Sequence, residues 1–222
     1  MNTRKIMHSM EKDFNEEFLK LRQGLEIHLK QDFDIKVTRN FLKDYVPKEV
    51  IGKAEILLDT ILNYLMEQAG FDLEQADIKL QNSFYERDFR KIIRKWTKKV
   101  ENQLTLEPSS IQFSLDTRLL YGSTTAGMTA VAGVAATVAF STGRVIAAII
   151  GGIATLIASA IAFKLGFEKG ASKSRSKVKS EVEHYIADSE TLVLEWLKRV
   201  VNVFAAEFDE FCRANAYSPG KE

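Results

Sequence analysis

The chain has 222 residues, and its 31 lysines and arginines nearly balance 30 acidic residues to give a formal net charge of +1. This balance disfavours nucleic acid as a partner, since such binders carry an excess of positive charge. A single cysteine, Cys212, excludes an internal disulfide framework and a cysteine-based zinc site. The first residues contain no apolar segment, so we expect no cleavable signal peptide.

Helical spacing of apolar residues predicts a first helix over residues 3–31. A short helix over residues 37–45 should stop before Pro47, because the residue preceding proline disfavours helical dihedral angles. A third helix is expected over residues 48–68, with Gly70 ending it. The predicted apolar stripe of the first helix is Ile6, Met10, Phe14, Phe18, Leu21 and Leu25, and that of the third is Ile51, Ile56, Leu57, Ile61, Leu62 and Leu65.

A fourth helix is predicted over residues 73–104, and its second half is strongly basic. Its apolar stripe includes Phe84 and Trp96, so it either packs into a bundle or lies on a lipid surface. The last helix is predicted over residues 177–215. Its stripe is Val178, Val182, Ile186, Val193, Leu197, Val201, Phe204, Phe208 and Phe211. No segment alternates like a strand, so the predicted fold class is all-α.

Two uncharged limbs precede the last helix. Residues 119–143 contain no charged side chain, and after Arg144 the next 19 residues, 145–163, contain none either. A limb of residues 123–140 or 145–163 has a helical length of roughly 27–29 Å, which is about the thickness of the bilayer hydrocarbon. We expect a helical hairpin with Gly143 and Arg144 at its turn. Small residues four apart, such as Ala126 and Ala130, would let the helices approach closely.

This hairpin is the predicted membrane-contact site. The residues expected to insert are Ala126, Gly133, Val138, Phe140, Ile146, Ile150, Ile153, Leu156, Ile157 and Ile161. Cations crowd both flanks, and we expect the following to meet anionic headgroups: Arg90, Lys91, Arg94, Lys95, Lys98, Lys99, Lys164, Lys169, Lys173 and Arg175. Because both flanks lie on one side of a spanning hairpin, the positive-inside tendency makes that side cytoplasmic.

Signatures of catalysis are absent from the sequence. There is no H-E-x-x-H motif and no G-x-x-x-x-G-K-[ST] phosphate loop. The histidines His8, His28 and His184 are far apart. We therefore assign no catalytic residue, no cofactor and no metal, and expect a protein that is not an enzyme.

The Gly/Ala-rich limbs TTAGMTAVAGVAATVAF and VIAAIIGGIATLIASAIAFKLG, followed by a basic stretch and a long amphipathic helix, resemble the membrane-inserting portion of bacterial dynamin-like proteins. The resemblance covers residues 73–213. It implies conditional insertion into membranes. That family has a GTPase domain with a phosphate loop, which this sequence lacks, so a GTPase or other effector would be a separate partner. The hairpin is also similar to those of α-helical pore-forming toxins.

The sequence thus predicts an elongated all-α bundle with a Gly/Ala-rich apolar hairpin. The expected parts are an N-terminal bundle (residues 1–111), the hairpin (112–170) and a C-terminal helix returning to the bundle (171–222). The expected function is to anchor, remodel or permeabilise a membrane at its cytoplasmic face, as a homo-oligomer that prefers anionic lipids. The alternative is a soluble scaffold, adaptor or regulatory subunit whose hairpin is buried in a core or a partner interface.

Overall fold

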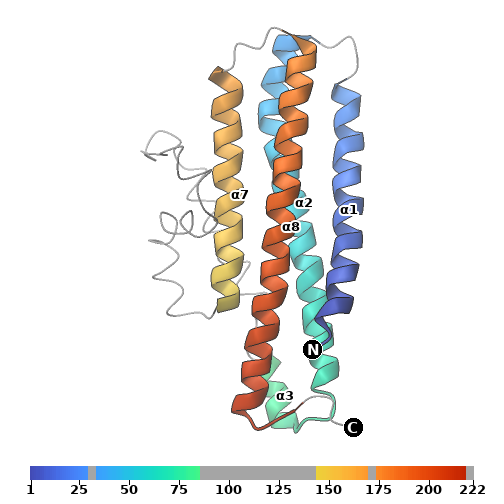
Figure 1. Cartoon of the computed structure of the whole chain (residues 1–222), viewed down its shortest axis with the longest axis vertical. Coiled ribbons are helices and arrows are strands. Elements are labelled where there is room, and N and C mark those ends of the chain that lie inside the picture. Colours follow the sequence, from blue (N-terminus) through green and yellow to red (C-terminus); the bar gives the residue numbers. More distant parts are fainter. Residues whose placement is uncertain (30–33, 86–143, 170–173, 219–222) are drawn as a thin grey trace. The chain divides into compact units, whose positions relative to one another are not determined.

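The computed structural model describes residues 1–29, 34–85, 144–169 and 174–218, in which no strand occurs (Figure 1). The predicted all-α bundle is confirmed. The helices of these ranges are α1 (Thr3–His28), α2 (Ile35–Asp72), α3 (Ile78–Tyr85), α7 (Arg144–Lys169) and α8 (Arg175–Ala214). Contacts group the chain into unit 1 (Met1–Gln68 and Leu156–Val201) and unit 2 (Ala69–Thr155 and Asn202–Glu222), and each unit is described by itself. The domain boundaries predicted near residues 111 and 170 lie outside the described residues.

Unit 1 is a bundle in which each of four helices contacts two neighbours, in the cyclic order α1, α2, α7, α8. The contacts that join successive neighbours are Glu17–Lys53 (2.7 Å), Asp44–Lys164 (2.7 Å), the rings of Phe163 and Tyr185 (4.2 Å) and Arg22–Glu190 (2.7 Å). The residue order runs in opposite directions on neighbouring helices. In α1 and α8, for example, Glu11 pairs with Lys198, whereas the later Arg22 pairs with the earlier Glu190. Neighbouring helices are therefore antiparallel, which is the up-down-up-down arrangement of four-helix bundles.

The buried residues of α1 and α8 come from the apolar stripes read in the sequence, and those of α8 from Phe204 onward belong to unit 2. All six predicted stripe residues of α1 are buried, as are all nine of α8. Helical spacing identifies the buried residues of these two helices correctly because polar residues occupy the outer faces and apolar residues the inner ones. In α2 the prediction is partly wrong, since Ile56 is exposed while Val50, Ala54 and Leu58 are buried.

The predicted break at Pro47 is wrong. α2 continues through this residue as one helix of 38 residues. Proline lacks the N–H that would bond to the carbonyl four residues earlier, which costs about 3 kcal/mol inside a helix. Leu42, Val46, Val50 and Ala54 surround this position along one buried face of α2. Burial of that face on both sides of Pro47 offsets the local penalty and holds the helix together.

The predicted end of the helix at Gly70 and the predicted helix over residues 73–104 also need correction. α2 runs two residues past Gly70, and a turn over Leu73–Gln75 separates it from α3. In unit 2, the ring of Phe84 packs against those of Phe208 and Phe211, with centroids 5.5 and 5.6 Å apart. A Cβ atom on Gly70 would lie 2.5 Å from the Tyr85 hydroxyl, so glycine allows this close approach. Residues 86–104 lie outside the described part of the chain.

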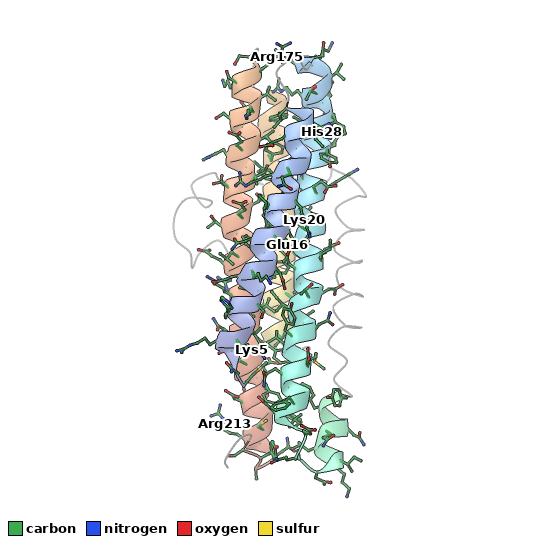
Figure 2. All side chains as sticks on the ribbon, turned by 90° about the vertical axis from the view of Figure 1, so that its right-hand side faces the viewer. Lys5, Glu16, Lys20, His28, Arg175 and Arg213 are labelled. Carbon is green, nitrogen blue, oxygen red and sulfur yellow. The ribbon has the colours of Figure 1, made fainter. Side chains whose placement is uncertain are left out.

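Glu17 is a half-buried acceptor between two lysines of unit 1. Its two carboxylate oxygens lie 2.8 Å from the Lys20 Nζ and 2.7 Å from the Lys53 Nζ. These hydrogen bonds lower the pKa of Glu17 below its ordinary value. The neighbouring Glu16 also reaches Lys20, at 3.0 Å, but stays exposed to solvent (Figure 2).

We expect Glu17→Gln to lower the free energy of unfolding by about 1 kcal/mol at pH 7, because it removes a charged acceptor from Lys53. The folded-state pKa is depressed, so this stabilisation is present above the unfolded pKa and is lost as the pH falls through the folded one. The difference between the two proteins should therefore vanish at acidic pH. Urea unfolding across pH measures it, with Glu16→Gln as the exposed control. Equal effects of the two variants would contradict the assignment.

Candidate membrane-contact helix

α7 has the length and composition of a membrane-crossing helix over Arg144–Phe167, and no other helix of the described ranges does. Its 24 residues rise about 36 Å, more than one hydrocarbon thickness. The core helix of a soluble bundle can have the same composition. The packing of α7 therefore bears on which role it takes.

One face of α7 is packed against other helices. The buried residues are Val145, Ile146, Ile149, Ile150, Ile153, Leu156, Ala160 and Phe167, and most of them have large side chains. They recur at three or four residues, so they form one stripe. Four of the residues predicted to insert into a membrane belong to this stripe: Ile146, Ile150, Ile153 and Leu156. In the structure these four pack in protein.

The opposite face of α7 is mostly apolar and only partly buried. Of the 18 consecutive residues of α7 that are most apolar, only 39% are buried. Thr155 and Ala162 are exposed, while Gly151, Ala154 and Ala158 are half-buried, as are the predicted inserting residues Ile157 and Ile161. Most large side chains of α7 thus face inward, while its outer side carries small residues together with Ile157, Ile161 and the 47% exposed Leu165. An apolar surface of this kind is typical of a face that another helix or lipid covers.

The first residue of α7 is tied to α8 within unit 2. The Arg144 backbone N–H donates to the Glu207 carboxylate, and the Arg144 guanidinium lies 2.9 Å from Glu210 Oε2. A carboxylate at a helix N-terminus satisfies an unpaired donor and interacts favourably with the helix dipole. The predicted turn residue Arg144 therefore contacts protein here. Its side chain and that of Glu210 are 71% and 59% exposed, so the ion pair itself is weak.

Tyr185 of α8 is the main aromatic contact of α7 within unit 1. Its ring stacks on that of Phe163, with centroids 4.2 Å apart, and the residue is buried. Burial raises the pKa of Tyr185 to about 12, and the hydroxyl groups of Ser189 and Ser159 act in the opposite direction. The contact therefore combines ring stacking with polar groups in an otherwise apolar interface. Its place on the α8 stripe, between Val182 and Ser189, was a signal that the sequence analysis did not use.

The predicted headgroup residues are partly described. Lys164 pairs with Asp44 of α2 at 2.7 Å, and this hydrogen bond lowers the pKa of Asp44. Arg175 is the exposed first residue of α8 and is seen at the end of unit 1 in Figure 2. Lys169 ends α7, and its side chain is not described. The remaining predicted residues lie outside the described ranges: Arg90, Lys91, Arg94, Lys95, Lys98, Lys99, Lys173, Ala126, Gly133, Val138, Phe140 and Gly143.

In the described ranges, no three His, Cys, Asp or Glu side chains are placed to hold a metal ion. Comparison of the chain with protein-family models, with curated proteins and with solved structures found no match. The resemblance to dynamin-like proteins and pore-forming toxins therefore stays a prediction. The packing of α7 carries the functional argument.

The two faces of α7 should respond differently to a charge. We expect Ile153→Lys to lower the free energy of unfolding by more than about 3 kcal/mol, because it buries an unpaired ammonium group. Thr155→Lys, two residues away on the exposed face, should change it by less than about 0.5 kcal/mol. Thermal and urea unfolding of both variants measure the difference. Similar losses in the two variants would mean that the outer face is covered by protein.

Proposed function

We propose that the chain is a non-enzymatic, membrane-associated helical protein in which α7 is held by the bundle in one state and enters a bilayer in another. The observation that supports this proposal is the partly exposed, mostly apolar outer face of α7, on a helix without a charged residue between Arg144 and Lys164. Covering such a face, and so removing it from water, lowers the free energy of the protein. A bilayer covers it along its full length.

The two faces of α7 differ in how much transfer from the bundle to lipid stabilises them. The inward residues, such as Ile149 and Leu156, escape water equally well in a protein core and in lipid. Moving them from one to the other therefore changes little. The outward face, with Thr155 and Ala158, is removed from water only when lipid or another helix covers it. The balance then depends on the contacts of Tyr185 and Arg144 and on what replaces α7 in the bundle.

Charge supports an anionic, cytoplasmic membrane surface. Lys164 directly follows the apolar stretch, and Arg175, Lys177 and Lys179 lie in the first turns of α8. Cations next to an anionic leaflet contribute about 1 kcal/mol each. With the predicted limb over residues 123–140, the insertion unit is a hairpin tipped by Arg144. It would anchor, remodel or permeabilise the membrane, and several copies are needed to enclose a pore.

A soluble scaffold or adaptor is the rival function, and the buried face of α7 favours it. In that case the stripe from Val145 to Leu156 is simply core, and the outer face receives another protein helix. The two functions differ in their response to lipid. A scaffold is monodisperse without detergent and unchanged by vesicles, whereas the proposed protein floats with them and protects α7 from protease.

Thr155→Lys tests the proposal without damaging the bundle. Thr155 lies near the middle of the apolar span, where a lysine costs about 3 kcal/mol of insertion, or roughly a hundredfold in binding. We expect flotation with phosphatidylglycerol vesicles and protease protection of α7 to be lost. Dye release in the same samples separates a pore from an anchor.

Thr191→Lys in α8 is the matched control. Thr191 is likewise exposed, and its hydroxyl donates to the carbonyl four residues earlier, as that of Thr155 does. This variant should float like the wild type. Unchanged flotation and protection of Thr155→Lys, or no flotation of the wild type in any lipid, would remove insertion of α7 as the function.

Weakening the contact of α7 with α8 should increase membrane binding. Tyr185→Ala removes a stacked, buried ring and should lower the free energy of unfolding by about 3 kcal/mol. Because the loss falls on the contact that holds α7, we expect more protein on vesicles than for the wild type. Leu21→Ala, in the core stripe of α1, is the control of similar cost. An equal rise in both variants would indicate general unfolding instead of release of α7.

A further inference from the structure

An exposed apolar patch lies where α1 ends and α2 begins in unit 1. It consists of Val37 and Phe41, which lie one turn apart on α2 and are 68% and 42% exposed, and is called the Phe41 patch below; Ile27, which precedes His28 on α1, is 64% exposed. The Phe41 ring packs between His28 and Tyr45, with centroids 4.8 Å from each. The two helices thus meet at this patch, yet Val37 and much of the ring remain in solvent.

The Phe41 patch lies at the same end of unit 1 as the C-terminal end of α7. The Arg39 guanidinium donates to the carbonyl oxygen of Phe167 and lies 5.2 Å from the centroid of its ring. Asp44 pairs with Lys164, as described above. Figure 2 shows His28 and Arg175 towards this end. An α7 that leaves the bilayer after Phe163 would therefore bring the Phe41 patch close to the lipid surface.

Cations outnumber acids by seven to five at this end, and two of the cations, Lys164 and Lys179, pair with Asp44 and Glu183. Within residues 26–45, 164–167 and 174–183, the described cations are Lys36, Arg39, Lys43, Lys164, Arg175, Lys177 and Lys179. The described acids are Glu26, Asp34, Asp44, Glu181 and Glu183. The N-termini of α2 and α8 lie at this end as well, and their dipoles add positive potential. Exposed aromatic and aliphatic side chains among cations are the composition of surfaces that rest on a membrane interface.

We propose that this end of unit 1 docks on an anionic lipid surface, with Val37 and Phe41 entering the headgroup region while the surrounding cations contact lipid phosphates. This inference rests on the proposed function for the side on which the membrane lies, but it needs no insertion of α7. It gives the protein a peripheral contact that precedes release of the helix. The contact comes from α1 and α2, which the sequence analysis did not connect with lipid.

The double variant V37S/F41S tests the docking surface in the full chain. We expect its binding to vesicles of phosphatidylcholine with phosphatidylglycerol to fall by about tenfold in flotation, since two apolar side chains no longer leave water. The matched control is L19S/I56S, which removes two apolar side chains of α1 and α2 that are 54% and 52% exposed. Its binding should change by less than about twofold. Vesicles of phosphatidylcholine alone should bind the wild type weakly.

The outcomes separate this surface from insertion of α7. Full binding of V37S/F41S overturns the docking surface, even if Thr155→Lys abolishes protease protection and so upholds insertion. Conversely, loss of binding in V37S/F41S supports the surface even if α7 is never protected. Equal loss in L19S/I56S overturns it, because apolar exposure in general would then drive binding. A change of V37S/F41S in oligomeric mass by light scattering, with unchanged vesicle binding, assigns the patch to a second copy and also overturns it.

Discussion

The packing of the large side chains of α7 into the bundle is the interaction on which the rest of the structure depends. A helix without charge over most of its length needs cover in water, and protein buries Ile149 and Ile153 in unit 2 and Leu156 in unit 1. Burial of each such side chain contributes about 1.5–3 kcal/mol relative to exposure. The hydrophobic effect is not directional, so a lipid environment stabilises these side chains as well as a protein core does. The same stripe that stabilises the bundle is therefore the one that a membrane would accept.

The directional contacts of α7 in the described ranges differ in how exposed they are. The ion pair of Arg144 with Glu210 is largely exposed, and pairs of that kind contribute little. The pair of Lys164 with Asp44 is similarly half-exposed. Tyr185 differs because its stacked ring is buried and its hydroxyl group meets serines. α7 is thus held by apolar packing together with these contacts and with those of Arg39 to the Phe167 carbonyl and ring, all of which release of α7 would have to break.

The sequence predicts this fold best where polar and apolar residues alternate with helical spacing. The stripes of α1 and α8 could be read completely, because charged residues mark their outer faces. α7 offers no such contrast, so periodicity could not separate its inner from its outer face. Side-chain size separates the two faces only in part, since Leu165 is exposed and Ala160 is buried. The continuous helix through Pro47 depends on burial on both sides of the proline. The Phe41 patch depends on contacts between α1 and α2 and on which side chains remain exposed, neither of which spacing along the chain reveals.

Release of α7 also has a consequence for the helices that stay behind. In unit 1, α7 lies between α2 and α8, so its departure would expose the apolar side chains of both helices that now face it. The free-energy cost of exposing each large side chain of α2 and α8 to water is similar to the free-energy decrease when a large side chain of α7 enters lipid. A single copy in water therefore keeps α7 in place. The opposition disappears when another surface covers the vacated faces, and a second copy of the same bundle has side chains of the right kind. Insertion and assembly would then be coupled, which connects the expected oligomer to the packing of one helix.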